Sequence, residues 1–181
     1  MRKFKWIGCG SGVGVLLLGL FLLFGQFAPF GNAHAQQATT QGGAKEIVVS
    51  LSKQWMYVYQ NGQQVYDTPV TTGAPDLPTP LGTYHIFYKV SPTTFHSPFP
   101  RNSKHWYPPV KVQYAMEWKA GGYFIHDAWW HTTYGPGTNV MHYDPTYGWQ
   151  SGSHGCIAVP LEAAKWLYNW TTIGTTVRVV S

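Results

Sequence analysis

Beyond residue 44, one segment of this chain is predicted to be a helix, and nearly every other patterned segment is predicted to be a β-strand. The helix is expected over residues 161–170, where alanines and large apolar side chains follow Pro160, which fits a first helical turn. The expected strands are rich in β-branched and aromatic residues and are bounded by turn-forming residues. They cover residues 46–52, 54–60, 63–71, 82–89, 110–118, 122–126 and 175–180. This pattern predicts one mostly β domain with a single main helix, without a repeat or a second domain.

The first 44 residues have the layout of a targeting segment followed by a linker. A basic stretch, residues 2–6, precedes an apolar run that ends before Ala33-His34-Ala35, which is typical of a signal peptide covering residues 1–35. The uncharged run of residues 7–33 is also long enough to span a bilayer, so an uncleaved membrane anchor is the alternative. Residues 36–44 are polar and are expected to form a flexible linker. The domain of residues 45–181 is therefore expected to be exported and to act outside the cytoplasm.

The charge of the chain argues against nucleic acid as a partner. Arg2, Lys3 and Lys5 supply three of the net charge of +5, which leaves +2 on the remainder of the chain. No lysine or arginine cluster follows them, so neither a nucleic-acid surface nor a polybasic membrane anchor is predicted. Contact with a membrane is expected only through the N-terminal segment, if that segment is not cleaved.

Cys156 is the one cysteine left when the targeting segment, which holds Cys9, is removed. Exported proteins normally pair their cysteines, because an exposed free thiol is open to oxidation. A buried cysteine that acts as a small apolar residue is the simplest alternative. The surrounding Ser153-His154-Gly155-Cys156 and the upstream His126 favour a nucleophile instead.

A nucleophilic thiol depends on its neighbours. Its ordinary pKa is about 8.5, so only a small fraction is thiolate at neutral pH without a base or an electropositive pocket. His126, at the end of a predicted strand, and His154 are both candidate bases. Gly155 permits a tight turn that exposes Cys156 and points backbone N–H groups at a reacting carbonyl. These residues predict acyl transfer through a thioester.

The same residues resemble the signature of the YkuD-like L,D-transpeptidases of bacterial cell walls, in which an upstream histidine is followed by Ser/Thr-His-Gly-Cys. The resemblance covers about residues 45–180. Its landmarks are residues 47–54, the hairpin at 57–62, Thr79-Pro-Leu-Gly-Thr83 and the helix after the cysteine. It implies a mostly β, sandwich or barrel-like sheet with one main helix after the catalytic cysteine and a long active-site loop.

By this resemblance, Cys156 is the nucleophile and His126 is the general base. A backbone carbonyl, that of Asp127, is expected to hold the imidazole in the useful tautomer. The Asp127 carboxylate is not expected to complete a Cys-His-Asp triad, because neighbouring residues of a strand point to opposite faces.

Three further residues are expected to support the site. His154 shapes the pocket, and Ser153 supports the turn by hydrogen bonding. Backbone amides around Gly155 and Cys156 are expected to stabilise the oxyanion.

The chain departs from the family pattern at two places. Ala158 stands two residues after the cysteine, where the family usually has Asn or Arg. The segment between the histidine and the Ser-His-Gly-Cys motif, residues 127–152, is longer than is common in the family. It is crowded with aromatic side chains, of which Trp129, Trp130 and Tyr134 are predicted to bind substrate. The alternative is that these rings only pack the segment onto the sheet.

The resemblance also implies a reaction. The donor is a peptidoglycan tetrapeptide stem, attacked at the L,D bond before its terminal D-Ala, and the acceptor is a side-chain amine on a neighbouring stem. The product is a 3-3 cross-link in the bacterial cell wall, and carbapenems are expected to acylate the same cysteine. Water in place of the amine would make the protein an L,D-carboxypeptidase. Neither a cofactor nor a metal is required, because the thioester stores the energy of the cleaved bond.

Two interpretations from other classes remain open. A zinc site could be built from the potential ligands His126, His131, His142, His154 and Cys156. No compact ligand spacing supports it, and no metal is predicted. A noncatalytic wall-binding module would need only the aromatic segment, but that interpretation leaves the free thiol unexplained.

Overall fold

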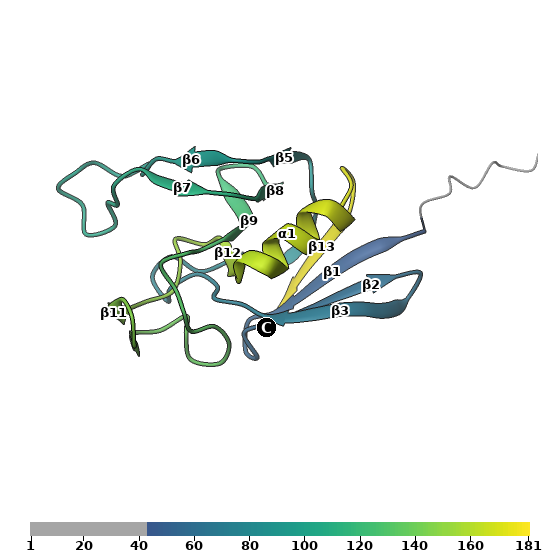
Figure 1. The fold of residues 1–181 in the computed structure, drawn as a ribbon, viewed down its shortest axis with the longest axis horizontal. Helices are drawn as coiled ribbons and strands as arrows, with labels where there is room; N and C mark the ends of the chain where they lie inside the picture. Colours follow the sequence, from purple (N-terminus) through teal and green to yellow (C-terminus); the bar gives the residue numbers. More distant parts are fainter. Residues whose placement is uncertain (1–42) are drawn as a thin grey trace, which may run out of the picture. The chain divides into compact units, whose positions relative to one another are not determined.

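The structure, a computed structural model, describes residues 43–181. Five strands form the first sheet, in the order β3-β2-β1-β13-β4 (Figure 1). They are β1 (Lys45–Ser50), β2 (Trp55–Gln60), β3 (Gln63–Pro69), β4 (Gly82–His85) and β13 (Thr176–Val180). The predicted hairpin is confirmed, with Asn61 and Gly62 at positive φ between β2 and β3. β13 pairs in parallel with β1 and lies between β1 and β4, so the last strand of the chain is an inner strand of this sheet.

The second sheet carries the strands next to the signature motif. Its order is β12-β9-β8-β5, where β12 pairs in parallel with β9 and the remaining pairs are antiparallel. The strands are β5 (Tyr88–Val90), β8 (Ala115–Lys119), β9 (Tyr123–Asp127) and β12 (Ile157–Val159).

The prediction of one strand over residues 82–89 is wrong, because the chain changes sheet within it. Ile86 is fully buried, and its N–H donates to the Thr175 carbonyl beside the first sheet. The next N–H, of Phe87, donates to Glu117 in the second sheet. The run therefore divides into β4 and β5, and each half completes the edge of a different sheet.

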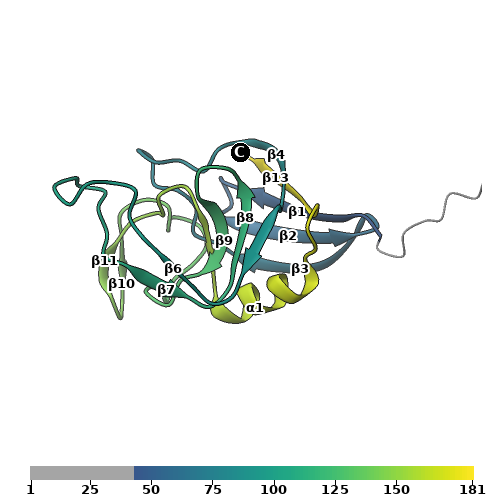
Figure 2. The same ribbon diagram turned by 90° about the horizontal axis from the view of Figure 1, so that it is seen from above.

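Short strands also form outside the predicted ones. β6 (Thr93–Phe95) pairs with β7 (Val110–Val112), and the chain between them forms an extended arm. β10 (His142–Asp144) pairs with β11 (Gly148–Gln150) inside the long segment 127–152. The two hairpins lie at the same end of the domain, away from the β2–β3 turn (Figure 2).

The predicted helix is confirmed as α1 (Leu161–Trp170), which directly follows β12 and Pro160. Its Ala163, Ala164 and Leu167 are buried in the core between the sheets. Full burial of a leucine side chain contributes about 1.5–3 kcal/mol to folding. On the neighbouring face, Trp166 stacks on Tyr66 of β3 with ring centroids 4.3 Å apart. The mostly β fold with one main helix is therefore confirmed, and the helix anchors the strand that follows the cysteine.

The N-terminal predictions fall largely outside the described residues. The signal peptide or anchor, Cys9 and residues 36–42 of the linker all precede residue 43. From residue 43 to 181, no helix has the length and apolar character that a membrane span requires.

Candidate active site

His126 lies on β9, and Cys156 directly precedes β12, the strand that pairs with β9 in parallel. In the register, Ile157 is opposite Ile125 and Ala158 is opposite His126. Because side chains alternate along a strand, Cys156 and His126 point to the same face of the sheet, with the two isoleucines buried on the other face. Both residues line one cleft of about 520 Å³. The backbone pairing thus brings together two residues that are thirty positions apart in the sequence.

The imidazole of His126 is held by the backbone of the next residue. Its Nδ1 lies 2.8 Å from the carbonyl oxygen of Asp127. A carbonyl oxygen can only accept, so Nδ1 carries the proton and Nε2 keeps its lone pair. The Asp127 carboxylate instead accepts the N–H groups of Gln113 and Tyr114, at 2.8 and 2.7 Å. The carbonyl therefore orients the imidazole, and the carboxylate fixes the turn between β7 and β8.

Aromatic rings cover the same imidazole on two sides. Phe95 of β6 meets His126 edge-on at a centroid distance of 5.0 Å, and Trp130 lies at 5.9 Å with the planes tilted by 31°. Burial lowers the pKa of His126, although the hydrogen bond to Asp127 acts in the opposite direction. The histidine is consequently neutral at physiological pH and able to accept a proton.

The thiol of Cys156 is half-buried and engaged by the backbone of β9 and the turn before it. The Phe124 N–H donates to Sγ at 3.4 Å, and the thiol donates to the Gly122 carbonyl oxygen at 3.4 Å. Burial raises the pKa of Cys156 to about 11, against the opposing effect of the Phe124 N–H. In the resting state the thiol is therefore protonated, and its proton must leave before the sulfur can attack a carbonyl.

Ser153 supports the turn that carries the cysteine, as the sequence predicts. Its hydroxyl donates to the Cys156 carbonyl at 2.6 Å and accepts the Gly155 N–H at 3.1 Å. The expectation that the Gly155 N–H points at a reacting carbonyl is therefore not met, since Ser153 already occupies that donor. Gly155 is required for another reason. It has a φ of +100°, and a Cβ there would lie 2.7 Å from Cε1 of Tyr123.

Thr79 supports the same turn from outside the signature, a role that was not predicted. Its hydroxyl donates to the Gly155 carbonyl at 3.0 Å and accepts the Gly73 N–H at 2.8 Å. Both contacts are buried, so they are shielded from competition by water. The only feature of the sequence that pointed to Thr79 was its place in Thr79-Pro-Leu-Gly-Thr83, which was recognised as a landmark of the family but not as part of the site.

Gln54 is a second unpredicted support. Its side-chain amide is fully buried, donates to the Thr72 hydroxyl at 2.7 Å and accepts the Thr72 N–H at 2.8 Å. The Thr72 carbonyl in turn accepts the N–H of Ser153 at 2.9 Å. This chain of hydrogen bonds connects the β1–β2 turn to the start of the cysteine motif.

His154 lies at the mouth of the site and lines the clefts on both sides of the cysteine. Its ring packs against Tyr107, with centroids 5.1 Å apart, and against Phe99 at 5.9 Å. Burial lowers the pKa of His154, and the neighbouring His105 adds to the effect. These contacts place His154 among the walls of the pocket, where the sequence analysis expected it.

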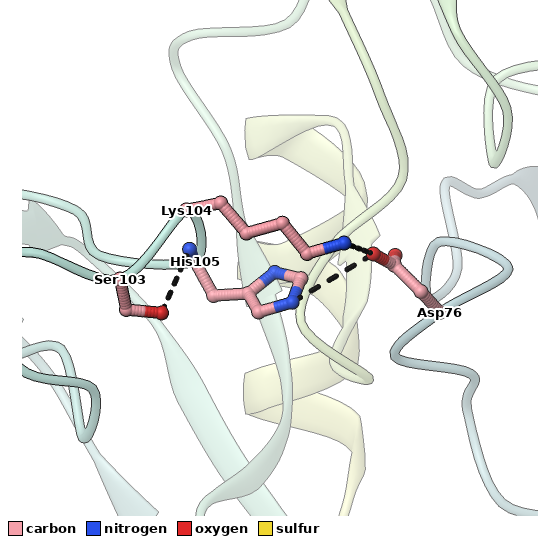
Figure 3. A network of polar contacts seen from close by, with 4 residues as sticks. All are labelled: Asp76, Ser103, Lys104 and His105. Carbon is pink, nitrogen blue, oxygen red and sulfur yellow. Dashed lines mark hydrogen bonds and ion pairs between the residues drawn. The ribbon is translucent and has the colours of Figure 1, made fainter.

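Lys104 and His105 of the arm between β6 and β7 contact Asp76 (Figure 3), and the ring centroid of His105 lies 6.0 Å from that of His154. Asp76 accepts a hydrogen bond from Lys104 Nζ at 2.8 Å and lies 3.7 Å from His105 Nε2. The Ser103 hydroxyl accepts the N–H of His105 at 3.1 Å. Lys104 and Asp76 are exposed, so this ion pair contributes little to stability and mainly sets the position of the arm.

Two clefts meet at Cys156. One, of about 430 Å³, is lined by the 121–124 turn, β6 and the arm. The other, of about 520 Å³, is lined by residues 129–131 and 150–153. Four residues line both clefts, namely Phe95, Tyr107, His154 and Cys156. Cys156 is therefore reached from both clefts.

The aromatic residues predicted to bind substrate are not all in the cleft. Trp129 and Trp130 line it together with His126. Tyr134 lies outside both clefts, and its hydroxyl donates to the Ala128 carbonyl at 2.8 Å. The packing alternative therefore describes Tyr134. Ala158, where the family has a larger polar residue, lines the cleft beside His126.

Asp144 organises the long segment, which was also not predicted. Its buried carboxylate accepts backbone N–H groups from Thr132 at 2.7 Å, Thr146 at 2.9 Å and Tyr147 at 3.0 Å. Burial alone would raise its pKa, but these donors outweigh burial and hold the pKa of Asp144 well below its usual range. The sequence feature that could have indicated this role is that Asp144 is an acidic residue in a segment with almost no other charged side chain.

The five residues considered as alternative zinc ligands do not form one cluster. The rings of His131 and His142 stack with centroids 6.3 Å apart. Within residues 43–181, no group of three or more His, Cys, Asp and Glu side chains is arranged to hold a metal ion.

Known proteins are similar to this chain in sequence and in fold. The model of the YkuD family, the L,D-transpeptidase catalytic domain, matches residues 44–179. L,D-transpeptidase 1 of Mycobacterium tuberculosis is 28% identical over 142 residues, which make up 77% of this chain and 51% of that protein. This chain therefore spans about half the length of that relative.

Solved structures of L,D-transpeptidases are also similar to this chain. L,D-transpeptidase 3 from Mycobacterium tuberculosis, in complex with a faropenem-derived adduct, has a TM-score of 0.61 and 27% identity over 76% of this chain and 60% of its own. An L,D-transpeptidase in complex with imipenem has a TM-score of 0.63 and 28% identity over 76% of this chain and 59% of its own.

Proposed function

The chain belongs to the YkuD family of L,D-transpeptidase catalytic domains, and from that membership we propose that it cross-links peptidoglycan stem peptides through a thioester on Cys156. The known role of the family is peptidoglycan cross-linking. The observation that carries the proposal is the shared cleft of Cys156 and His126, with Nε2 of the histidine free to accept a proton.

In the first half-reaction, the Cys156 thiol transfers its proton to Nε2 of His126, and the sulfur attacks the carbonyl before the terminal D-Ala of a tetrapeptide stem. The C–N bond of the resulting tetrahedral intermediate breaks. The proton on His126 passes to the departing amine, D-Ala leaves, and the donor stem remains as a thioester. Because burial lowers the pKa of His126 and raises that of Cys156, both groups are proposed to be neutral before the donor stem reacts.

In the second half-reaction, an amine on a neighbouring stem enters the cleft that the donor stem does not occupy and attacks the thioester. His126 takes a proton from this amine and returns it to the sulfur as the C–S bond breaks. The product is an amide between two stems, a 3-3 cross-link. Water could replace the amine and would give a shortened stem, the product of an L,D-carboxypeptidase.

Three parts of the surroundings have proposed roles in this chemistry. The Cys156 N–H is the proposed oxyanion donor, now that the Gly155 N–H is assigned to Ser153. Trp129 and Trp130 are proposed to contact the stem that enters their cleft. His154 and Tyr107 separate the two entrances.

Carbapenems and related β-lactams are proposed to acylate the same sulfur. Relatives of this chain have been solved with imipenem and with a faropenem-derived adduct. A strained β-lactam carbonyl presents the same electrophile as the stem, and ring opening would leave a thioester on Cys156.

The proposed substrate also indicates where the domain acts. Peptidoglycan lies outside the cytoplasmic membrane, so we propose that residues 1–35 export the domain and are either removed or retained as an anchor.

The test is mass spectrometry of tetrapeptide-stem muropeptides after incubation with the protein, compared with Cys156→Ala. D-Ala release with joined stems, lost in the variant, supports a transpeptidase. Cysteine-dependent release with only a shortened stem assigns an L,D-carboxypeptidase. No release by the wild-type protein contradicts the proposal and favours a wall-binding role.

A further inference from the structure

We propose that the outward face of the β10–β11 hairpin binds an uncharged polysaccharide, the glycan strand to which the stem peptides are attached. This inference rests on the proposed function for the identity of the glycan. It concerns a surface outside the cleft, in the long segment that separates His126 from Ser153.

The first observation is a pair of exposed aromatic rings on one face. Tyr143 of β10 and Trp149 of β11 are directly opposite in the register, with ring centroids 5.8 Å apart. Their exposed fractions are 63% and 71%, which is high for side chains that are usually largely buried. The other two pairs of the hairpin, His142 with Gln150 and Asp144 with Gly148, point to the opposite face.

The second observation is that the exposed rings are carried by a rigid support. Asp144 accepts the N–H groups of Thr146 and Tyr147 in the turn, and it also binds Thr132 on an earlier part of the segment. A surface that is already ordered loses little conformational entropy when a ligand binds. The hairpin therefore holds Tyr143 and Trp149 in fixed positions in solvent.

The third observation is that segment 127–152 has no exposed Asp, Glu, Lys or Arg side chain. Asp127 and Asp144 are the only Asp, Glu, Lys or Arg residues of segment 127–152, and both are buried and hydrogen-bonded. An anionic polymer or an anionic membrane would need cationic partners, which this segment does not supply. Sugar rings fit better, since their C–H faces pack on aromatic rings while their hydroxyls find polar groups such as the exposed hydroxyl of Thr146.

The fourth observation is continuity with the cleft. Tyr147, in the turn of the hairpin, packs against Trp129 at a centroid distance of 6.2 Å. Trp129 and Gln150 of β11 both line the cleft that contains Cys156. Because stems are covalently attached to the glycan, a strand bound on the hairpin would raise the local concentration of stems at this entrance.

The test compares wild-type protein with the double variant Tyr143→Ala, Trp149→Ala. The probe for binding is a soluble β-1,4-linked N-acetylglucosamine oligomer, and a free tetrapeptide stem is the probe for activity. Phe87→Ala is the matched control, because this ring is 49% exposed and lines neither cleft. The double variant should bind the oligomer about tenfold more weakly, or worse. Its rate on the free stem should stay within about twofold of wild type.

Several outcomes decide the inference. Equal oligomer binding by the wild type and the double variant, or no binding by either, would overturn it. Binding of wild type to anionic lipid vesicles that is lost in the double variant, without oligomer binding, would overturn it in favour of a membrane surface. Retained oligomer binding by Trp149→Phe, a conservative aromatic change, would support it. If wild type binds the oligomer but does not act on the free stem, the surface stands and the proposed reaction fails.

Discussion

The edge of the Phe95 ring meets the imidazole of His126, with ring centroids 5.0 Å apart and an interplanar angle of 88°. Phe95 is the last residue of β6 and lies at the base of the arm, where it is paired with Val110 of β7. The arm thus contributes directly to the apolar environment that lowers the pKa of the histidine. The ionisation of the proposed base is therefore coupled to the position of the arm.

Replacing Phe95 by Ala should move the acidic limb of the profile of kcat/KM against pH toward neutrality. The base must be unprotonated, and its lowered pKa keeps it so below its ordinary value of about 6.5. Hydration of the imidazole would raise the pKa, so activity would be lost at a higher pH as the solution is acidified. Phe95→Leu, which keeps an apolar cover, is the control. An acidic limb at the same pH in all three proteins would contradict the coupling.

Alkylation of Cys156 by iodoacetamide should accelerate with pH throughout the range from neutral to about 10. The reason is that the pKa of the thiol is raised to about 11, so the thiolate fraction is still increasing there. The same protein unfolded in urea is the internal control, since its thiol should titrate near the ordinary value of about 8.5. A rate that is constant between pH 6 and 9 would instead show a thiolate–imidazolium pair.

Thr79→Val should lower kcat and also cost about 1–3 kcal/mol of unfolding free energy. The substitution preserves shape but removes the hydroxyl that donates to Gly155 and accepts from Gly73. Denaturant unfolding and steady-state kinetics measure the two effects. Thr79→Ser keeps the hydroxyl and should restore most of the activity; a Ser variant as impaired as the Val variant would argue for packing as the role of Thr79.

Gly155→Ala should reduce kcat by about a hundredfold, because a displaced sulfur no longer reaches the carbonyl correctly. The change combines a positive φ with a clash against Tyr123. Gly174→Ala separates these causes, since Gly174 has a φ of +89° but open space around its Cβ position. The control should lose only about 1–2 kcal/mol of stability and keep its activity. Equal activity losses in both variants would mean that strain alone explains the effect.

The sequence was sufficient for features that depend on local pattern. The helix at 161–170 and the hairpin at Asn61-Gly62 follow from propensity and turn chemistry. Cys156 could be chosen as the one cysteine beyond the targeting segment, whereas the choice of His126 among the eight histidines of the chain depended on the family resemblance. The division of residues 82–89 could not be predicted, because both halves have strand composition and only the burial of Ile86 between two sheets separates them.

The supporting residues of the site were harder to predict because their partners are distant in the sequence. The Thr79 hydroxyl binds a carbonyl 76 residues away, and the Gln54 amide binds Thr72, which is 18 residues away. Threonine and glutamine have no chemistry that marks them as part of a site until those partners are known. The occupied amide of Gly155 likewise depends on a side-chain rotamer of Ser153, which no sequence pattern determines.

The parallel pairing of β9 with β12 has a consequence for how such domains can diversify. The chain leaves the second sheet after Asp127 and returns to it just after Cys156, yet the register of the two strands positions both Cys156 and His126. The part of this segment that lines neither cleft, residues 132–149, can therefore be lengthened, shortened or exchanged without altering the spacing of nucleophile and base. It behaves as an interchangeable cassette, and grafting it between related domains would transfer a recognition surface while leaving the reaction centre intact.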